Sequence, residues 1–434
     1  MKYYIIISIL IVNLFSREWD YSADILEKGF EDGNEVRIFK SKNPLDQNVI
    51  ISSDTISIFT QKAKQYIDSK KLILTGSVLM INGNDSLECD NMIFWYGSQK
   101  DSLKAIGEVN FKFQNNLLNT DKLSYYETNG FRGYSFSTDG NSTLIDPKYN
   151  IKAEQIIYDD DYQEMELILN ANVNSENQGV MGNNIDLIFA DSLIKKISVQ
   201  DNGYVFNNHY AIANNKQYQI FKDEMYGNDL EINLNAGIID SVLINGMAKS
   251  IYYVVNEENN LMGYNEATGN AIKLYYKNGD LNTLNIIGDA RGVFYPEIGQ
   301  TKLDSILNYK ASIIDYDVTN ELTRLYENVE IEYQMTKLKS NNVKIDWNSN
   351  NLYAFSNEEE KSEIVNQNQK PIVGDNLEFD LINKKGVIQL GETVVGDGIY
   401  KSNTIHRQEP NIYHMNKSIY TTCEHGHPHY YFKT

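Results

Sequence analysis

Apolar and polar residues alternate along most of the chain, and the stretch 72–94 shows this pattern most clearly. It contains two alternating segments separated by the polar residues 82–85, and the second segment, LECDNMIF, runs from Leu87 to Phe94. Alternation with a period of two predicts strands with one apolar face. Two such strands around a short polar turn predict a β-hairpin.

The frame of this hairpin returns along the chain. Its acidic position is occupied by Asp54, Asp90, Asp121 and Glu154, in steps of 36, 31 and 33 residues. Between these copies lie strands in which a small residue precedes a valine, as in the segment GEV at 107–109. Strand pairs that repeat in this way predict a stack in which each unit buries its apolar face against its neighbours.

A related, longer repeat has copies that start at Gly182, Gly227 and Gly269, which are separated by 45 and 42 residues. We expect its glycines to lie at turns or at close backbone approaches within strands. The most polar segment, 357–369, predicts a loop or hinge, and a further strand is expected to start at Leu377.

Composition supports an all-β chain and narrows the function. The sequence holds 31 Tyr but only 6 Pro, and its formal net charge is -20. Such a charge argues against nucleic-acid binding, because no basic patch is available to release phosphate counterions. A well-solvated acidic surface is the simplest interpretation of the charge.

The first residues predict export. Residues 1–16 carry one Lys followed by an apolar run that is too short to span a bilayer but has the length of a signal-peptide core. An uncleaved anchor is the alternative. No Cys stands directly after this run, so it is not a lipoprotein signal. No other segment is long and apolar enough to predict a transmembrane helix. The two cysteines are too few for a disulfide framework.

The repeats resemble a known family. The frame at Gly76–Phe94 and again at Gly107–Tyr125 is similar to the OstA-like domain of lipopolysaccharide-transport proteins, which LptA shares with the periplasmic part of LptD. The segments Tyr420–Cys423 and Pro428–Tyr431 are similar to the junction that precedes the barrel in LptD-type proteins. The resemblance implies an elongated, semi-open antiparallel β-jellyroll built of repeated strand pairs.

The same resemblance implies a division of the chain and a function. Residues 1–16 would be the signal peptide, 17–300 the OstA-like repeats, 301–405 a second OstA-like segment, and 406–434 a junction to a C-terminal barrel region missing from this sequence. The function would be transport of lipopolysaccharide through an apolar groove towards the outer membrane, in the periplasm or on the periplasmic side of that membrane. The implied partners are lipopolysaccharide, an LptA-like bridge protein and LptE-like translocon components.

Alternation identifies the residues that would line such a groove. These candidates share one face of their strands, and they are Val78, Met80, Val109, Phe111 and Phe113. The residues alone favour a closed core in which these side chains pack against each other, because alternating strands always need a core, and the family resemblance reverses this balance. An open trough would leave exposed edges, and we expect the region Asn48–Ile58 to pair with the last strand of an LptA-like partner.

The cysteines and the C-terminal histidines carry the remaining candidate chemistry. The resemblance implies that Cys423 takes part in a disulfide, whereas Cys89 replaces a small residue of the frame and is expected to be a buried thiol. A bond between the two stays open, because connectivity depends on coordinates. Cys423, His425, His427 and His429 alternate, as in a soft metal site, but Pro428 interrupts the strand. We therefore predict partly solvated histidines, no metal and no cofactor.

No catalytic motif emerges, so we predict that the protein is not an enzyme. The sequence contains no Gly-x-Ser-x-Gly, no His-Glu-x-x-His and no phosphate-binding loop. One alternative is a secreted β-solenoid carbohydrate-active enzyme, which requires a parallel coil with a carboxylate cluster on one face. Another is a structural surface protein, which requires a solid core and no groove.

Overall fold

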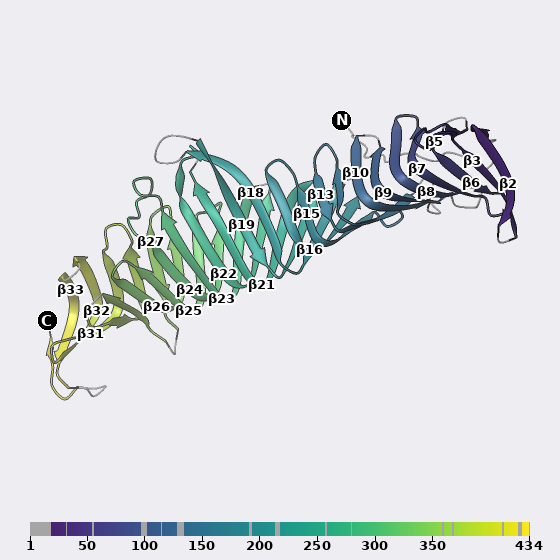
Figure 1. Cartoon of the computed structure of the whole chain (residues 1–434). Helices are drawn as coiled ribbons and strands as arrows, with labels where there is room; N and C mark the ends of the chain where they lie inside the picture. The colour runs from purple at the N-terminus through teal and green to yellow at the C-terminus, as the bar shows by residue number, and fades with distance from the viewer. Residues whose placement is uncertain are drawn as a thin grey trace. The chain divides into compact units, whose positions relative to one another are not determined.

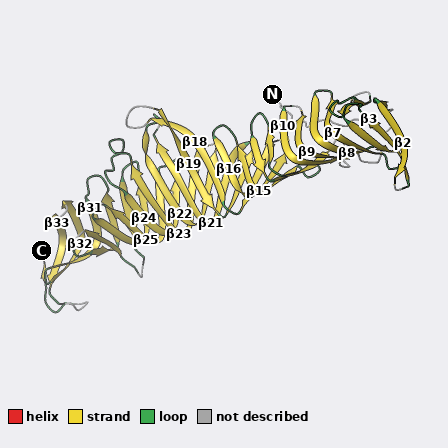
Figure 2. Ribbon diagram, in the orientation of Figure 1, coloured by secondary structure: helices red, strands yellow, loops and turns green. Residues whose placement is uncertain are grey.

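The computed structural model describes residues 19–433 except for short gaps at 32, 54–55, 97–101, 114, 128–133, 191–192, 213–217, 257, 279, 358–359, 367–368, 410–411 and 424–427. The predicted signal segment 1–16 lies outside the described residues. Within the described part, the chain contains strands, turns and loops but no helix, as Figure 2 shows. The prediction of an antiparallel all-β fold is confirmed.

The chain forms two compact units, one comprising Met1–Gly203 with Leu234–Gly237 and the other Tyr204–Asn233 with Ile238–Thr434. We call them unit 1 and unit 2. The strands of unit 1 are β1 Asp20–Ser22, β2 Ile25–Glu31, β3 Asn34–Lys40, β4 Val49–Ser52, β5 Ile56–Thr60, β6 Lys62–Tyr66, β7 Lys71–Asn82, β8 Asp85–Trp95, β9 Ser102–Phe113, β10 Asn116–Glu127, β11 Tyr134–Asp139, β12 Ser142–Ile145, β13 Asn150–Ala153, β14 Gln155–Asp159, β15 Glu164–Asn174, β16 Gln178–Ala190 and β17 Leu193–Gln200.

The strands that lie wholly or mainly in unit 2 follow in the same manner. They are β18 Gly203–Ile212, β19 Tyr218–Gly227, β20 Asp229–Asn235, β21 Ile238–Val255, β22 Leu261–Lys277, β23 Asp280–Pro296, β24 Leu307–Asp317, β25 Leu322–Tyr333, β26 Thr336–Asp346, β27 Asn351–Phe355, β28 Ser362–Asn366, β29 Ile372–Gly374, β30 Asn376–Asp380, β31 Gly386–Val395, β32 Gly398–Glu409, β33 Ile412–Thr421 and β34 Phe432–Lys433. The predicted boundary between residues 300 and 301 stays a prediction.

Within each unit, successive strands pair side by side in antiparallel register (Figure 1). The predicted hairpin at 72–94 is formed by β7 and β8, in which Leu72 lies opposite Phe94 and Asn82 opposite Asp85. Leu72 and Phe94 are fully buried, while the polar alternates on both strands are partly or wholly exposed. The period-two pattern therefore placed the correct residues on the buried face.

Several long strands carry a β-bulge near their middle, and in β7, β9, β21 and β23 a glycine with positive φ lies there. Gly107 and Glu108 both have positive φ, at 82° and 43°, and the β8–β9 register shifts between Glu88 and Asn91. A Cβ added at Gly107 would lie 2.2 Å from a carboxylate oxygen of Asp90. The acidic residue of the frame, Asp90, thus packs against the bulge of the next strand. Only glycine leaves enough space for this side chain at the bulge and also adopts the positive φ.

Unit 2 contains the same bend. Gly288 and Asp289 have φ of 77° and 46°, and the β23–β24 register shifts between Ile287 and Ala290. A Cβ at Gly288 would lie 2.5 Å from the side-chain nitrogen of Asn270. The shorter and the longer repeats are therefore two versions of one bent strand pair, with Asp in one and Asn in the other at the bulge.

The first copy of the frame, at Ile51–Ile58, includes residues of β4 and β5, with Ile51 opposite Ile58 in the pair that these strands form. One sequence prediction needs correction. The segment 357–369, predicted as a loop or hinge, contains β28, which pairs with β26 through Leu338 and Ile364. The strand has only two consecutive apolar residues, Ile364 and Val365, and the polar residues on either side hide it in the sequence. The strand expected at Leu377 is present as β30.

Candidate functional site

The predicted groove residues all lie on the buried face of unit 1. Their exposed fractions run from 1% to 8%, for Val78, Met80, Val109, Phe111 and Phe113. Phe111 and Phe113 stack with ring centroids 4.6 Å apart. Across the strands β7 to β10, register places large side chains in one row, namely Met80, Leu87, Phe111 and Leu118. Their role in lipid binding stays a prediction.

A cavity of about 370 Å³ lies inside unit 2, and its position was not foreseen from the sequence. Its apolar lining comes mainly from β21 to β24, and it includes Tyr252, Met262, Leu284, Ile286, Phe294, Tyr309, Ile314, Tyr316 and Trp347. A volume of several hundred Å³ lies in the usual range for sites that hold small organic ligands.

Small side chains in one row create this cavity. Register places Ser250 on β21 opposite Ala267 on β22, Ala267 opposite Gly292 on β23, and Gly292 opposite Tyr309 on β24. The Tyr309 ring lies over Gly292, where a Cβ would approach its ring carbon to 2.1 Å. Three successive strands therefore contribute little volume to the interior, and one aromatic ring covers only part of the space.

The lining combines an aliphatic surface with a few paired polar groups. Leu284, Ile286 and Ile314 form the aliphatic part, and each is at most 6% exposed. The Tyr309 hydroxyl donates a hydrogen bond to Asn265 Oδ1 at 2.8 Å, and Trp347 Nε1 donates to Thr323 Oγ1 at 2.8 Å. Pairing these polar atoms with one another leaves the ligand-facing surface mainly apolar.

The tyrosines of this region carry no charge at neutral pH. Burial raises the pKa of Tyr309 to about 12, with the hydrogen bond to Asn265 acting in the opposite direction. Burial also raises the pKa of Tyr316 above its ordinary value, and the charge of a Tyr252 phenolate would raise it further. Desolvation disfavours the phenolate. Tyr309 and Tyr316 therefore contribute neutral hydroxyl groups to the cavity near pH 7.

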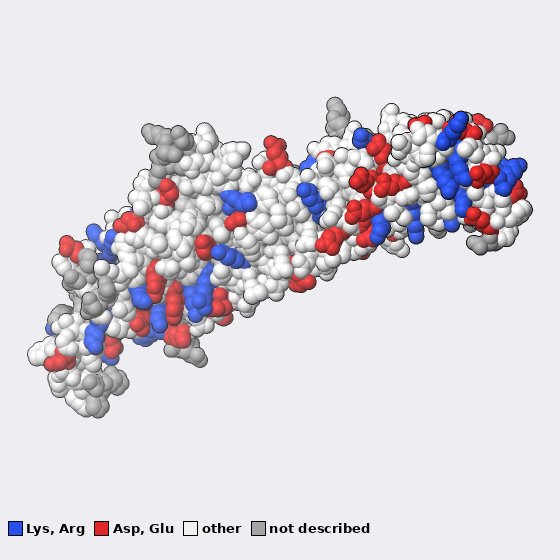
Figure 3. Space-filling model, viewed as in Figure 1, with Lys and Arg blue, Asp and Glu red and all other residues white. Residues whose placement is uncertain are grey.

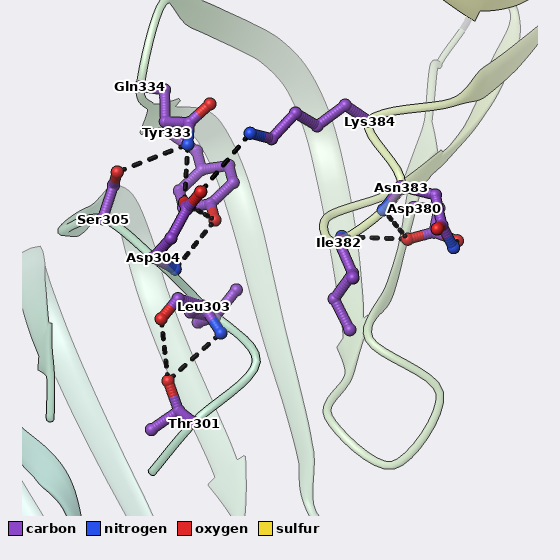
Figure 4. A network of polar contacts seen from close by, with 10 residues as sticks. All are labelled: Thr301, Leu303, Asp304, Ser305, Tyr333, Gln334, Asp380, Ile382, Asn383 and Lys384. Atoms are coloured by element: carbon purple, nitrogen blue, oxygen red, sulfur yellow. Dashed lines mark hydrogen bonds and ion pairs between the residues drawn. The ribbon is translucent and has the colours of Figure 1, made fainter. Parts of the chain in front are cut away.

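The connection 297–306 between β23 and β24 contributes Thr301, Lys302 and Leu303 to the cavity wall. Asp304 anchors this connection, because its Oδ1 accepts hydrogen bonds from the Tyr333 hydroxyl at 2.8 Å and from Gln334 Nε2 at 2.6 Å (Figure 4). These bonds lower the pKa of the Asp304 carboxyl, with the Tyr333 contribution the largest. The anchored segment holds Leu303, which is 5% exposed, against the cavity.

The strand edge predicted to bind a partner is already occupied. β4 pairs with β1 through Ile51 opposite Tyr21, and with β5 through Ile51 opposite Ile58. The prediction that Asn48–Ile58 offers a free edge is therefore wrong. Among the described strands, β2 pairs with β3 alone, and its Leu26 and Phe30 are 55% and 78% exposed. An exposed edge strand with apolar side chains favours strand addition.

The cysteine and histidine predictions have different outcomes. Cys89 is buried, as expected, with its Sγ 3.2 Å from the Asn91 carbonyl oxygen, and burial raises the pKa of its thiol to about 12. Cys423 Sγ lies 3.6 Å from His429 Nδ1, and the disulfide implied for Cys423 stays a prediction. His425 and His427 lie outside the described residues. Among the residues that the structure describes, no group of His, Cys, Asp and Glu could hold a metal ion.

Charges on the surface are mixed in sign. On the face shown in Figure 3, Lys and Arg alternate with Asp and Glu and are separated by large uncharged areas. Many of these charges form exposed pairs, such as Lys122 with Asp139 at 2.7 Å. Within the described ranges, no helix is both long and apolar enough to cross a membrane.

Comparison with known proteins gives one family match. Residues 60–188 match the family described as LptA/(LptD N-terminal domain) LPS transport protein. The crystal structure of LptH, the LptA homologous periplasmic component of the lipopolysaccharide transport device from Pseudomonas aeruginosa, is similar with 14% identity and a TM-score of 0.26, over 33% of this chain and 94% of that chain. No curated protein matches. The family match confirms the resemblance over residues 60–188, the part of the chain that the family model covers.

Proposed function

We propose that this protein is a non-catalytic periplasmic module that holds lipopolysaccharide by its acyl chains and passes it towards the outer membrane. Two observations on different parts of the chain support the proposal. Residues 60–188, in unit 1, match a family of lipopolysaccharide-transport proteins. Unit 2 contains the cavity of about 370 Å³ with its aliphatic and aromatic lining.

The cavity is the single observation that carries the proposal. Each methylene of an acyl chain that leaves water contributes ~0.8 kcal/mol, so a few methylenes inside the cavity would give substantial affinity without any reaction. The aliphatic side chains of Leu284, Ile286 and Ile314 suit hydrocarbon better than a sugar chain. In unit 1, the buried face that carries Val78, Met80, Val109, Phe111 and Phe113 is the further candidate for contact with acyl chains.

The proposal includes partners. The exposed β2, with Leu26 and Phe30, is the edge that we assign to an LptA-like bridge protein, in place of Asn48–Ile58. Strand addition there would satisfy backbone groups along Ile25–Glu31 and cover both apolar side chains. LptE-like components at the outer membrane complete the set of expected partners, and no described residue group requires a cofactor for this function.

Site-specific photocrosslinking tests where the lipid lies. A photoreactive phenylalanine analogue replaces Tyr316 in unit 2, and its matched control replaces Tyr275, an aromatic residue of the same unit that is 43% exposed. In unit 1, Phe111 is compared with Tyr126, which is 44% exposed. Crosslinks to lipopolysaccharide at Tyr316 and Phe111 but not at their controls are expected. Equal labelling at Tyr275 and Tyr316 would refute lipid binding in the cavity.

The same method tests the partner edge. A photoreactive residue at Phe30 on β2 is expected to capture an LptA-like protein in cells, while one at Tyr162, a loop residue that is 73% exposed, is not. If Phe30 captures no bridge protein, or if Tyr162 captures it equally, β2 is not the docking edge.

The alternative functions fit less well. A carbohydrate-active β-solenoid requires a parallel coil, but the register of β7 to β10 and of β21 to β26 is antiparallel throughout. A purely structural surface protein requires a solid interior, and the cavity of unit 2 argues against it.

A further inference from the structure

Arg407 is a buried cation on the inner face of β32. Only 8% of the residue is exposed, and it follows the buried Ile405 by two positions on the same face of the strand. Its Nε and Nη1 atoms are buried and have no hydrogen-bond partner among the described residues. A buried guanidinium in which two of the three nitrogens have no hydrogen-bond partner is costly, because these nitrogens have lost their water.

The surroundings of Arg407 contain no compensating carboxylate. None of the ion pairs among the described residues involves Arg407. Burial lowers the pKa of the Arg407 guanidinium, and the smaller electrostatic influence of Tyr413 acts in the opposite direction. The guanidinium carbon lies 5.6 Å from the centroid of the Phe379 ring. This cation–π contact offsets only part of the desolvation.

The orphaned guanidinium lines a small pocket of unit 2. The pocket volume is about 20 Å³, which is enough for one water-sized group such as a single oxygen of an anion. Arg407 lies opposite Gly386 on β31, which has no side chain to cover it. Tyr413 and Gln369 also line the pocket and are tied together by a hydrogen bond of 2.8 Å from the Tyr413 hydroxyl to Gln369 Oε1.

The rest of the pocket divides into apolar walls and one further cation. Ile364, Ile372, Leu377 and Ile388 supply apolar walls, and each is at most 9% exposed. Lys370 lines the same pocket and is exposed. The chain has a net charge of -20, but this pocket is lined by two cations, the buried Arg407 and the exposed Lys370. This arrangement matches an anionic head attached to hydrocarbon.

We propose that Arg407 binds one phosphate or carboxylate oxygen of an amphiphile, and that the hydrocarbon extends out of this small pocket. This inference rests on the proposed function, since it treats the interior of unit 2 as a lipid path, and adds to it a buried cation in a second pocket. An entering anion replaces the lost water around Nε and Nη1. A neutral amphiphile with the same tail gains nothing there, so the pocket discriminates by head-group charge.

The test compares amphiphiles with one tail and different heads. The purified full chain is titrated calorimetrically with dodecyl phosphate, dodecanoate, dodecyl maltoside and inorganic phosphate, each below its aggregation threshold. Dodecyl phosphate and dodecanoate are expected to bind roughly 10- to 100-fold more tightly than dodecyl maltoside. The Arg407→Met variant is expected to abolish this preference, while Arg407→Lys retains most of it.

Controls separate this inference from misfolding and from the proposed function. Lys401→Met removes a charge from the same strand, where Lys401 pairs with Glu392 at 3.0 Å, and is expected to leave the preference unchanged. Arg407→Met is expected to unfold at the same or a higher urea concentration, because it removes an uncompensated buried charge.

Three outcomes would overturn the inference. Equal binding of all amphiphiles, unaffected by Arg407→Met, would remove the anion site and leave the apolar cavity intact. Inorganic phosphate binding as tightly as dodecyl phosphate would show a free-anion site rather than an amphiphile site. Failure of every amphiphile to bind the unaltered chain would refute the apolar path of the proposed function as well.

Discussion

One row of inward-facing side chains from each unit shows how the same backbone gives different interiors. In unit 1, the row across β7 to β10 is Met80, Leu87, Phe111 and Leu118, all large and at most 8% exposed. In unit 2, the row across β21 to β24 is Ser250, Ala267, Gly292 and Tyr309, and it borders a cavity of about 370 Å³.

The bends of the strands do not account for this difference. Gly107 in unit 1 and Gly288 in unit 2 have nearly the same φ, 82° and 77°, and each packs against a short polar side chain of the preceding strand. Backbone geometry is thus shared, while side-chain volume in each row differs. Interiors pack to a nearly constant density, so a row of small residues leaves space unless larger neighbours move into it.

Chemical labelling should show the largest contrast between the two interiors. Cys89 in unit 1 is 5% exposed, and burial raises the pKa of its thiol to about 12. At pH 8 its thiolate fraction would be about a thousandfold below that of an ordinary cysteine. In a Cys423→Ser background, a maleimide reagent is expected to modify Cys89 only after urea unfolding.

The matched variant places a cysteine at the cavity of unit 2. Ala267→Cys, in a chain with Cys89→Ala and Cys423→Ser, lies at a position that is 2% exposed but lines the cavity. Labelling without urea is expected there, since a small reagent can enter the cavity. Equal protection of Cys89 and the new thiol would mean that the two interiors do not differ in access.

Truncation of one leucine in each unit should show the next largest effect. Leu87→Ala in unit 1 is expected to lower the free energy of unfolding by about 2–5 kcal/mol, since it leaves a void in a closed row. Leu284→Ala is expected to cost about half as much, because Leu284 already borders empty space and loses fewer contacts.

Urea unfolding followed by tryptophan fluorescence measures both changes. Trp95 on β8 reports on unit 1, and Trp347 beside the cavity reports on unit 2. Equal losses for Leu87→Ala and Leu284→Ala would contradict the packing difference between the rows.

Substitution of the bulge glycines should affect both units alike. Gly107→Ala and Gly288→Ala each add a Cβ within 2.5 Å of a facing side chain at a positive φ, and each is expected to cost about 2–3 kcal/mol. Gly33→Ala is the control, because its φ is 79° but nothing lies within 4 Å of the added Cβ. Backbone strain alone should cost about 1 kcal/mol there. A Gly33→Ala loss as large as the others would show that the facing side chains do not matter.

Removal of the Asp304 carboxylate, which anchors the connection 297–306, should have the smallest effect on stability, and this effect should depend on pH. Hydrogen bonding from Tyr333 lowers the pKa of Asp304, so its contribution to stability is present above the carboxyl's unfolded pKa near 3.9 and is lost as pH falls through the lowered folded value. Asp304→Asn should reduce stability by about 0.5 kcal/mol at pH 7, since the side chain is 60% exposed.

Thermal unfolding of the unaltered chain and of Asp304→Asn, measured between pH 7 and pH 3 through Trp347 fluorescence, tests this prediction. The two proteins should differ at pH 7 and converge at low pH. A difference that grows as pH falls would have the wrong sign for a carboxyl whose pKa is lowered by folding.

Much of the fold could be read from the sequence, and the reasons are local. The hairpin at 72–94, the burial of Val78, Met80 and Phe111, and the buried thiol of Cys89 all follow from period-two alternation within single strands. The family resemblance came from the same repeated frame and is confirmed over residues 60–188.

The cavity and the Arg407 pocket depend on register, which the sequence does not display. Ser250, Ala267, Gly292 and Tyr309 are unremarkable in their own strands and become one row only when four strands are aligned. Arg407 reads as a surface residue of a polar tail until β31 and β32 place it opposite Gly386.

Alternation and glycine spacing by themselves determined that this chain forms bent antiparallel strand pairs with one apolar face, because those properties depend on neighbours within a few residues. Only the tertiary structure decided where the apolar face closes and where it leaves space. Packing depends on the summed volume of side chains that are 15 to 60 positions apart along the chain, such as Ser250 and Tyr309.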